Sequence, residues 1–535
     1  MNRKLHFGSM LIAFLAVSMS VWAQGDVLWK KNFGGLGADE YLSVTAVSDG
    51  VIAVGCSRDW SFGNGDWEGV EGNGNYDAII VKYDNAGNVV WKKNFGGSSF
   101  DYFYAVATVS DGVIAVGDSH RFGDGDWEGV TGKGNGDAII VKFDFNGKVV
   151  WKKNFGGNGN DRYDGVTIVS DGIVAVGSSH YQSFGNGDWV GVAGQIDDDA
   201  IIVKYDHHGN VVWKKSFGTN YRDWYESVTA VSDGIIAVGH KYQSSSYRDV
   251  IIVKYDNNGN ILWNKDLNNA GYHYYSVATV SDGVIAVGNN SSNDGIIVKY
   301  DNSGNVVWKK NLHGGFDCVT EVSDGVIVAG YAYISTSGGS DWEGFTGHGA
   351  CDAILVKYDF NGNIVWKKHF GGKGYDKYHS IVAVPDGIIA VGESYDLLGS
   401  GSSFGNGDLE DLTGKGGGDA IIVKYSTNPT SITDNSQDAT LRVYPNPTNG
   451  QLHITGFDGR DAMNGVCTDV QIFDVYGRKV LTAAAPVETH GRASLHHHHQ
   501  PQHPTTTLDI SHLPEGVYFL RIGGKTTKIV KINNN

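Results

Sequence analysis

The sequence predicts an all-β repeat protein, and three observations lead to that prediction. A unit of four short segments recurs seven times between residues 26 and 425. Each segment has four to seven residues, is rich in Val, Ile and Tyr, and is bounded by Gly, Asp or Asn, as β-strands are. The repeats begin on a fourth segment with no third before it and end on a third with no fourth after it. Because these fragments complete each other, we predict a seven-bladed β-propeller closed by the N-terminal strand.

The first and second strands of each unit are expected to form a tight hairpin near the propeller axis. In the first unit an apolar stretch at residues 43–47 leads through Ser-Asp-Gly into Val-Ile-Ala-Val-Gly. Gly supplies the positive φ that such a turn requires. The first strands carry small and β-branched residues, which suits the crowded centre of a ring.

The third and fourth strands are expected to lie farther out, joined by Asp-x-x-Gly turns. Lysines follow the Trp of the fourth strand, and lysines on an outer strand discourage pairing with another molecule. Seven units have only six such turns, so the missing turn marks where the ring is sealed without a covalent connection. A parallel β-helix is the alternative, but its coils are usually shorter and it does not explain the complementary ends. The fourth strands carry Trp29, Trp91, Trp151, Trp213, Trp263, Trp308 and Trp366.

Composition and the N-terminus limit the partners and the location. The chain has 76 Gly, 8 Pro and a formal net charge of −17, which argues against nucleic acid and anionic membrane surfaces. Residues 1–23 read as a secretory signal, with Arg3 and Lys4 before an apolar core and a small-residue cleavage site. No other stretch is long enough to span a bilayer. We therefore expect an exported protein with no membrane-spanning segment after signal removal.

Four cysteines are too few for a disulfide-built fold, and their spacing is not that of a zinc site. Cys318 and Cys351 fall in the same unit, on segments expected to meet on one face. A bridge between them and two free thiols both remain open.

The run Asp-x-x-Gly-Asn-Val-Val-Trp-Lys resembles the tryptophan-docking repeat of quinoprotein-like propellers. The whole unit is also similar to repeats of secreted Bacteroidetes proteins, over about residues 26–425. The resemblance implies the fold and carries no activity. Quinone-dependent dehydrogenases would be expected to show adjacent cysteines and an extra blade, and this sequence has neither.

The propeller is expected over residues 24–425, followed by a linker at 426–439 and a second domain at 440–535. Strand-like segments at 441–444, 451–455, 470–475, 507–510, 516–522 and 528–532 are enough for a small Ig-like β-sandwich. Tyr-Pro-Asn-Pro at residue 444, Ile-Phe-Asp-Val-Tyr-Gly-Arg at 472 and Leu-Pro-Glu-Gly-Val-Tyr at 513 resemble the C-terminal sorting domain (type A) of type IX secretion cargo. That family implies passage through the periplasm, handling by the type IX machinery, and display on the outer cell surface or release.

An insert between about residues 483 and 507 departs from the compact form of that domain. It contains a run of histidines that could bind a transition metal, although a solvated low-complexity loop explains it as well. The histidines are His490, His496, His497, His498, His499 and His503.

The second-to-third loops are expected to share one face with the fourth-to-first loops, and long loops there suggest a site. A recurring phrase, Asn-Gly-Asp-Trp-Glu-Gly, places oxygen side chains as in the start of a Ca²⁺ loop, although the distal Glu of an EF-hand is missing. The alternative is an Asx-turn whose Trp packs between blades. The candidate calcium ligands are Asp66, Glu68, Asp124, Asp126 and Glu128.

Aromatic residues recur beside carboxylates on the same face, and exposed rings next to acids suit sugars. The alternative is that the rings wedge between blades and recur because the blade recurs. The candidate binding residues are Trp67, Trp127, Trp189, Trp342, Tyr41, Tyr104, Tyr163 and Tyr225.

No catalytic motif is present, so no catalytic residue or organic cofactor is predicted. We predict an exported surface or secreted protein that binds a glycan or a protein through its long-loop face. The alternative is an extracellular glycosidase or lyase that uses carboxylates on that face. A purely structural surface role is a third interpretation.

Overall fold

The computed structural model describes most of the repeat region and short segments of the C-terminal part. The described residues are 27–244, 247–267, 271–290, 292, 294–334, 340–396, 403–426, 442–444, 451–455, 469–474, 479–484, 506–511, 513, 516–522 and 525–531. The predicted signal at 1–23, residues 427–439 of the linker and residues 485–505 of the His-rich insert lie outside them. The chain divides into two compact units, which are treated separately.

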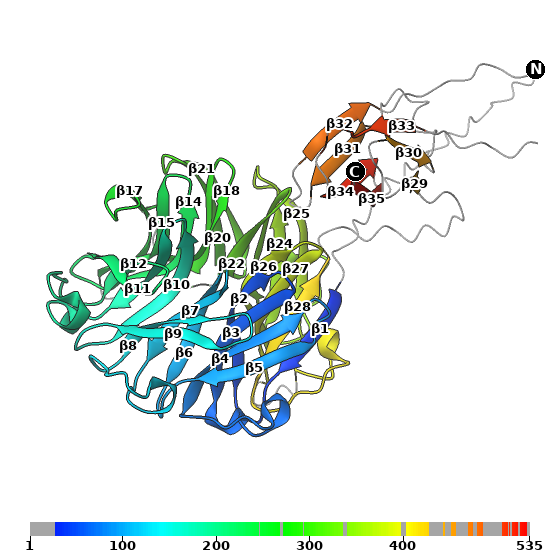
Figure 1. The fold of residues 1–535 in the computed structure, drawn as a ribbon. Coiled ribbons are helices and arrows are strands. Elements are labelled where there is room, and N and C mark those ends of the chain that lie inside the picture. The colour runs from blue at the N-terminus through cyan, green and yellow to red at the C-terminus, as the bar shows by residue number, and fades with distance from the viewer. Residues whose placement is uncertain are drawn as a thin grey trace, which may run out of the picture. The chain divides into compact units, whose positions relative to one another are not determined.

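The first unit contains seven antiparallel sheets of four strands each, set around a common axis (Figure 1). Blade 1 is β2 (Asp39–Val47), β3 (Gly50–Arg58), β4 (Tyr76–Asp84) and β5 (Val89–Phe95). Blade 2 is β6 (Asp101–Val109), β7 (Gly112–Ser119), β8 (Asp137–Phe143) and β9 (Val149–Phe155). Blade 3 is β10 (Asp161–Val169), β11 (Gly172–Ser179), β12 (Asp199–Tyr205) and β13 (Val211–Phe217). Blade 4 is β14 (Asp223–Val231), β15 (Gly234–Ser244), β16 (Tyr247–Tyr255) and β17 (Ile261–Lys265).

The remaining three blades complete the ring. Blade 5 is β18 (Tyr272–Val280), β19 (Gly283–Asn290), β20 (Asp294–Asp301) and β21 (Val306–His313). Blade 6 is β22 (Gly315–Val322), β23 (Gly325–Ala332), β24 (Asp352–Tyr358) and β25 (Ile364–Phe370). Blade 7 is β26 (Tyr375–Val384), β27 (Gly387–Tyr395), β28 (Asp419–Tyr425) and β1 (Val27–Phe33). Short 3-10 turns lie in the loops: η1 (Asp59–Ser61), η2 (Gly65–Trp67), η3 (Gly125–Trp127), η4 (Tyr181–Ser183), η5 (Gly187–Trp189), η6 (Ser340–Trp342) and η7 (Gly407–Leu409).

The N-terminal strand closes the ring, as predicted. Strand β1 pairs antiparallel with β28, from Trp29 opposite Lys424 to Phe33 opposite Ala420. Figure 1 shows the blue β1 beside the yellow β28. The seventh blade thus takes three strands from the end of the repeats and one from the beginning.

The first strands surround the axis, because each contacts the first strand of the next blade. The Thr45 and Thr108 hydroxyls are 2.9 Å apart between blades 1 and 2. The amide of Val44 donates to Ser380 Oγ at 3.3 Å and so joins blade 1 to blade 7. Between blades the sheets pack apolar faces, for example Phe95 against Trp127 with ring centroids 5.0 Å apart. The central placement of the first strands is therefore confirmed.

Each Asp-x-x-Gly turn covers a Trp of the preceding blade, which explains both motifs. Trp29 Nε1 donates to the Asn85 carbonyl at 3.1 Å, and Trp91 Nε1 donates to the Phe145 carbonyl at 3.0 Å. Gly87 has φ +80°, and a Cβ there would lie 2.8 Å from the Trp29 ring. Only Gly therefore suits this position, both for its backbone conformation and for the close contact.

The second unit has two antiparallel sheets. One contains β29 (Arg442–Tyr444), β30 (Gln451–Thr455) and β33 (Thr506–Asp509). The other has the order β32 (Lys479–Ala484), β31 (Asp469–Asp474), β34 (Gly516–Ile522) and β35 (Lys525–Lys531). The described part of this unit is all-β, and its arrangement as an Ig-like sandwich stays a prediction. Strand β32 was not predicted, because its Ala and Lys residues have low β-propensity.

Candidate functional site

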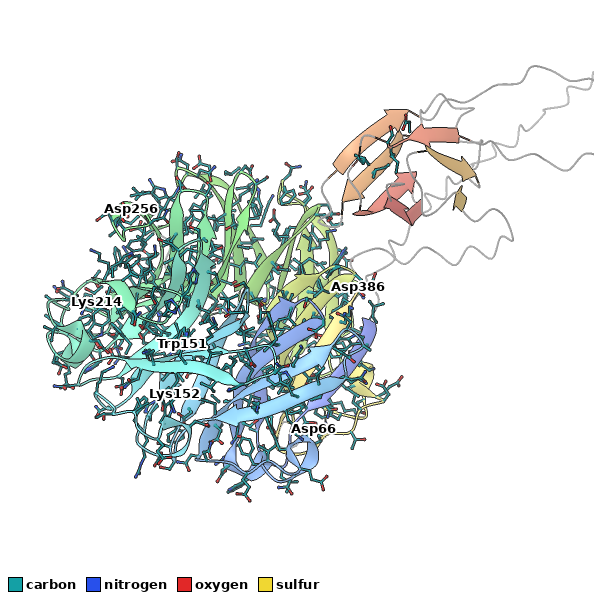
Figure 2. All side chains as sticks on the ribbon, viewed as in Figure 1. Asp66, Trp151, Lys152, Lys214, Asp256 and Asp386 are labelled. Atoms are coloured by element: carbon teal, nitrogen blue, oxygen red, sulfur yellow. The ribbon has the colours of Figure 1, made fainter. Side chains whose placement is uncertain are left out.

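The long loops gather on one face of the propeller and the tight turns on the other. Figure 2 shows Asp66, in the β3–β4 loop, at the opposite end of the propeller from Asp256 and Asp386, which lie in tight turns. We call the end with Asp66 the long-loop face.

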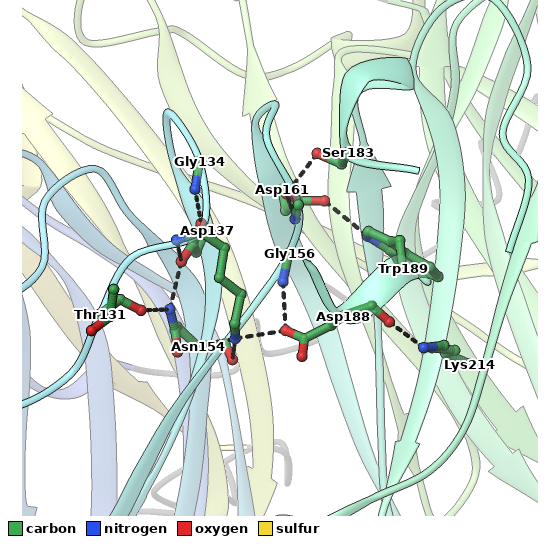
Figure 3. Close-up of polar contacts among 12 residues, drawn as sticks. Thr131, Gly134, Asp137, Asn154, Gly156, Asp161, Ser183, Asp188, Trp189 and Lys214 are labelled. Atoms are coloured by element: carbon green, nitrogen blue, oxygen red, sulfur yellow. Dashed lines mark hydrogen bonds and ion pairs between the residues drawn. The ribbon is translucent and has the colours of Figure 1, made fainter. Parts of the chain in front are cut away.

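The carboxylate that recurs at the start of the first strand holds the recurring loop Trp in place. Asp39 Oδ1 accepts from Trp67 Nε1 at 3.0 Å, and Asp39 Oδ2 accepts from the Gly35 amide at 2.9 Å. Figure 3 shows the same pattern in blade 3, where Asp161 accepts from Trp189 Nε1 at 3.0 Å. These acids and rings are built into the blade.

Seven of the eight predicted binding rings are buried, and the structure favours the alternative in which they pack between blades. Trp67, for example, has 0% exposure, and the Tyr41 hydroxyl lies 2.7 Å from that of Tyr83. A side chain without exposed surface has no face for a ligand to stack on. Tyr104 differs, because it is half-buried and lies at the end of β6 on the long-loop face. Ligand binding by these rings stays a prediction. The buried seven are Tyr41, Trp67, Trp127, Tyr163, Trp189, Tyr225 and Trp342.

The predicted calcium ligands are occupied by protein donors or stand apart. Asp66 Oδ2 accepts from the Gly34 amide at 3.0 Å and pairs with Lys415. Asp126 Oδ2 accepts from the Gly96 amide at 3.0 Å, and Asp124 accepts from Ser98 Oγ at 2.6 Å. Glu68 and Glu128 are exposed on the loop surface. Within the described ranges, metal-binding side chains gather at two other places and not here. Calcium binding at these residues stays a prediction.

Positions that differ from blade to blade form a different group, at the loop-face end of the first and second strands. We call it the mouth cluster, because the first strands surround the axis. It contains three positions of each blade: the residue after the recurring Asp, the residue two positions farther along the first strand, and the residue after the Gly of the second strand. In blade 3 these are Arg162, Asp164 and Ser178. Its charged and imidazole members are Glu40, Asp118, Arg162, Asp164, Glu226, His240, His273, Asp317, Lys377, His379 and Glu393.

The part of the mouth cluster over blades 2–4 lines a cavity of about 470 Å³. Arg162 pairs with Asp164, and its guanidinium lies 4.2 Å from the centre of the Tyr104 ring. Arg222 lies at the cavity wall and is paired with Asp197 at 3.3 Å. The wall includes Asp118, Arg162, Asp164, Arg222, Trp224 and Glu226.

The surroundings of Glu226 in this cavity shift its pKa. Burial, together with the nearby Asp164 carboxylate, raises the pKa of Glu226 to about 8. Burial also raises the pKa of Asp164, although the Arg162 guanidinium opposes it. At neutral pH the Glu226 carboxyl therefore carries its proton and can donate a hydrogen bond.

Two stacked imidazoles continue the cluster over blades 4 and 5. The rings of His240 and His273 have centroids 4.9 Å apart, and Arg248 Nη1 donates to His273 Nε2 at 3.1 Å. Burial lowers the pKa of His240 to about 3, assisted by the charges of His273 and Arg248. Burial and Arg248 lower the pKa of His273 to about 4. Both rings are neutral at physiological pH.

Blades 6, 7 and 1 complete the ring of charges. Lys377 Nζ lies 2.8 Å from Asp317 Oδ2, and His379 Nε2 lies 3.4 Å from Glu393 Oε1. The Cys56 thiol donates to Glu40 Oε1 at 3.0 Å. Burial, and then the charge of Glu393, raise the pKa of Glu40.

Two groups of described side chains bring three metal-binding atoms within 4.8 Å of one another. Glu40, His379 and Glu393 belong to the mouth cluster, and the second group is His348, His369 and Asp408. The cysteines add no ligand set, because Cys318 and Cys351 are free, buried thiols and are not bonded to each other. Cys467 lies outside the described residues.

Comparisons with known proteins match two separate parts of the chain. Residues 442–532 match the secretion system C-terminal sorting domain, and residues 197–340 match the family of the outer membrane protein assembly factor BamB. An uncharacterized protein of Aquifex aeolicus is 34% identical over 122 residues, which is 23% of this chain and 31% of that protein. The chain thus spans about a third of the length of this curated relative.

Among solved structures, BamB from Moraxella catarrhalis is 11% identical, with a TM-score of 0.36 over 75% of this chain and 99% of that one. The WD40 β-propeller domain of Doa1 is also 11% identical, with a TM-score of 0.40 over 74% of this chain and 98% of that one. The propeller architecture rests on the strand order of this chain itself.

The C-terminal unit is a type IX sorting domain, and the protein is exported to the cell surface or secreted. None of the helices in the described ranges has the length and apolar character needed to cross a bilayer.

Proposed function

We propose that this exported propeller protein is a binding protein whose ligand, a glycan, enters the cavity of the mouth cluster over blades 2–4. The observation that carries the proposal is the asymmetry of this cluster. Acids that recur in the blades hold the fold, whereas Arg162, Asp164 and Glu226 occur once each around a cavity of about 470 Å³. That volume is in the usual range of small-molecule sites.

The chemistry of the wall suits a ligand rich in hydroxyl groups. Carboxylates accept hydrogen bonds from hydroxyls, guanidinium groups donate to ring and glycosidic oxygens, and the half-buried Trp224 offers an apolar ring face. The wall carries both charge signs, which favours a neutral or zwitterionic glycan over a polyanion. A protein ligand on the same face is the other form of the proposal.

The test is a glycan array followed by calorimetric titration of the glycans that bind. Arg222→Ala removes an exposed cavity arginine, and we expect affinity to fall at least tenfold. Arg121→Ala is the matched control, because this exposed arginine lies on the same face in blade 2 and is outside the cavity wall. Equal affinity of the two variants would refute the cavity as the binding site.

A catalytic role is the alternative, and the presence of two carboxyls with raised pKa, Glu226 and Asp164, in one cavity wall favours it. A neutral carboxyl can serve as a general acid while an ionised one acts as base or nucleophile. In that case Glu226→Gln abolishes polysaccharide turnover and leaves binding within a few-fold. Unchanged product formation in the variant, or none from the wild-type protein, removes this alternative.

A further inference from the structure

A polar bridge recurs between neighbouring blades on the long-loop face. Between blades 2 and 3, Lys133 Nζ lies 2.6 Å from Asp188 Oδ2, and Asn154 Nδ2 donates to Asp137 Oδ2 at 2.5 Å. Figure 3 shows Asp188 also accepting from the Gly156 amide. The bridge thus consists of one lysine, one asparagine and an aspartate from each blade.

The same bridge joins blade 7 to blade 1. Lys415 pairs with Asp66, and Asn32 Nδ2 donates to Asp419 Oδ2 at 2.5 Å. The amide of Lys415 also donates to Asp419, as that of Lys133 does to Asp137. These shared contacts define the position of each residue in the bridge.

Between blades 6 and 7, histidines occupy both the lysine and the asparagine positions. The amide of His348 donates to Asp352 Oδ2 at 3.0 Å, as the lysine amides do in the other bridges. His369 Nδ1 lies 2.9 Å from Asp352 Oδ2, where the asparagines donate. The aspartate of the next blade is Asp408, whose Oδ2 lies 3.4 Å from His348 Nε2 and accepts from the Gly371 amide.

The two imidazoles are placed as metal ligands. Their ring centroids are 4.9 Å apart, and one donor atom from each ring and from Asp408 lie within 4.8 Å of one another. Asp352 holds the Nδ1 atom of His369, and a carboxylate–histidine contact of this kind orients metal-bound histidines. Tetrahedral ligands of zinc are about 3.3 Å apart, so closing the site requires movements of about 1 Å in these side chains.

We propose that His348, His369 and Asp408 bind Zn²⁺ and that the ion joins blade 6 to blade 7. Two nitrogen donors and one carboxylate favour zinc over calcium or magnesium, which prefer oxygen ligands. The side chains of His348 and Asp408 are 35% and 38% exposed, so an ion can enter and a water can complete the coordination. Blade 7 is the blade that closes the ring, and the ion would therefore stabilise the blade that depends on non-covalent pairing.

A different explanation is that protonated His348 simply replaces the lysine cation opposite Asp408. The two explanations separate in one experiment. The variant His348→Lys with His369→Asn restores the residues of the other bridges, so the blade contact is kept while the ligands are lost. The reference protein and the double variant both carry Gln in place of the histidines of the insert, which removes those imidazoles from the competition for zinc. These histidines are His490, His496, His497, His498, His499 and His503.

The full mature chain is stripped with a chelator and titrated with Zn²⁺ against a chromophoric competitor. We expect one tight site per chain in the reference protein and an affinity at least about 100-fold weaker in the double variant. Zn²⁺ should raise the melting temperature of the reference protein alone. Mg²⁺ and Ca²⁺ should cause no such rise. Equal zinc affinity in the two proteins, or no tight site in either, would overturn the proposal.

Discussion

Replacing Trp67 by Phe tests whether the recurring loop tryptophans belong to the fold. Trp67 Nε1 donates to Asp39 Oδ1 at 3.0 Å and lies 3.1 Å from Ser57 Oγ. Phe keeps an apolar ring but removes the indole donor from the buried Asp39 carboxylate, which costs about 1–3 kcal/mol. The smaller ring also loses contact with Phe33, which adds about 1 kcal/mol.

We therefore expect Trp67→Phe to lower the free energy of unfolding of the propeller by about 3 kcal/mol, or its melting temperature by roughly 5 °C. Trp60→Phe is the control, because this ring is 64% exposed and its loss should change stability by less than about 0.5 kcal/mol. Differential scanning calorimetry measures both. The reasoning fails if the two variants melt together, or if Trp67→Phe keeps its stability and loses ligand binding.

Two further predictions concern the dependence of stability on pH and the Asp-x-x-Gly turn at Gly87. Because the folded-state pKa of Glu226 is raised to about 8, its stabilising contribution is complete below about pH 4.5 and is lost as the pH rises through 8. The melting temperature of the wild-type protein should thus fall relative to that of Glu226→Gln between pH 5 and pH 9, and parallel pH profiles would contradict this pKa. Gly87→Ala should destabilise by at least about 1 kcal/mol more than Gly63→Ala in denaturant titrations. Both glycines have positive φ, but only a Cβ at position 87 meets the Trp29 ring. Equal losses would show that the turn is not packed on that ring.

The ring and its closure could be predicted from the sequence because the relevant signals are local and repeated. The pairing of β1 with β28 follows from the incomplete units at the two ends of the repeats. The turn at Gly87 and the Trp29 that it covers both belong to motifs that recur in the sequence.

The candidate site could not be predicted in the same way, because the recurring acids and rings fit two interpretations in the sequence, ligand binding and packing between blades. Trp67 and Asp39 recur since every blade needs the same internal hydrogen bond. Arg162 stands where the next blade has Trp224, and Asp164 and Glu226 stand where blade 2 has Tyr104. The sequence does show the positions at which the units differ. The proximity of these side chains across blades still depends on the closed ring, which no single unit reveals.

The two units of the chain have separate roles, export for the C-terminal unit and the candidate site for the propeller. The sorting domain directs the protein to the cell surface or the medium. In the described part of the propeller, the cavity over blades 2–4 is lined by residues that differ from blade to blade.

The most direct test of the proposed function is a crystal structure of the propeller with a glycan identified on the array. We predict that the sugar lies in the cavity over blades 2–4, with hydroxyl groups bonded to Asp164 or Arg222 and a ring face against Trp224. A glycan bound at the outer rim, or on the face with the tight turns, would contradict the assignment of the mouth cluster as the binding site.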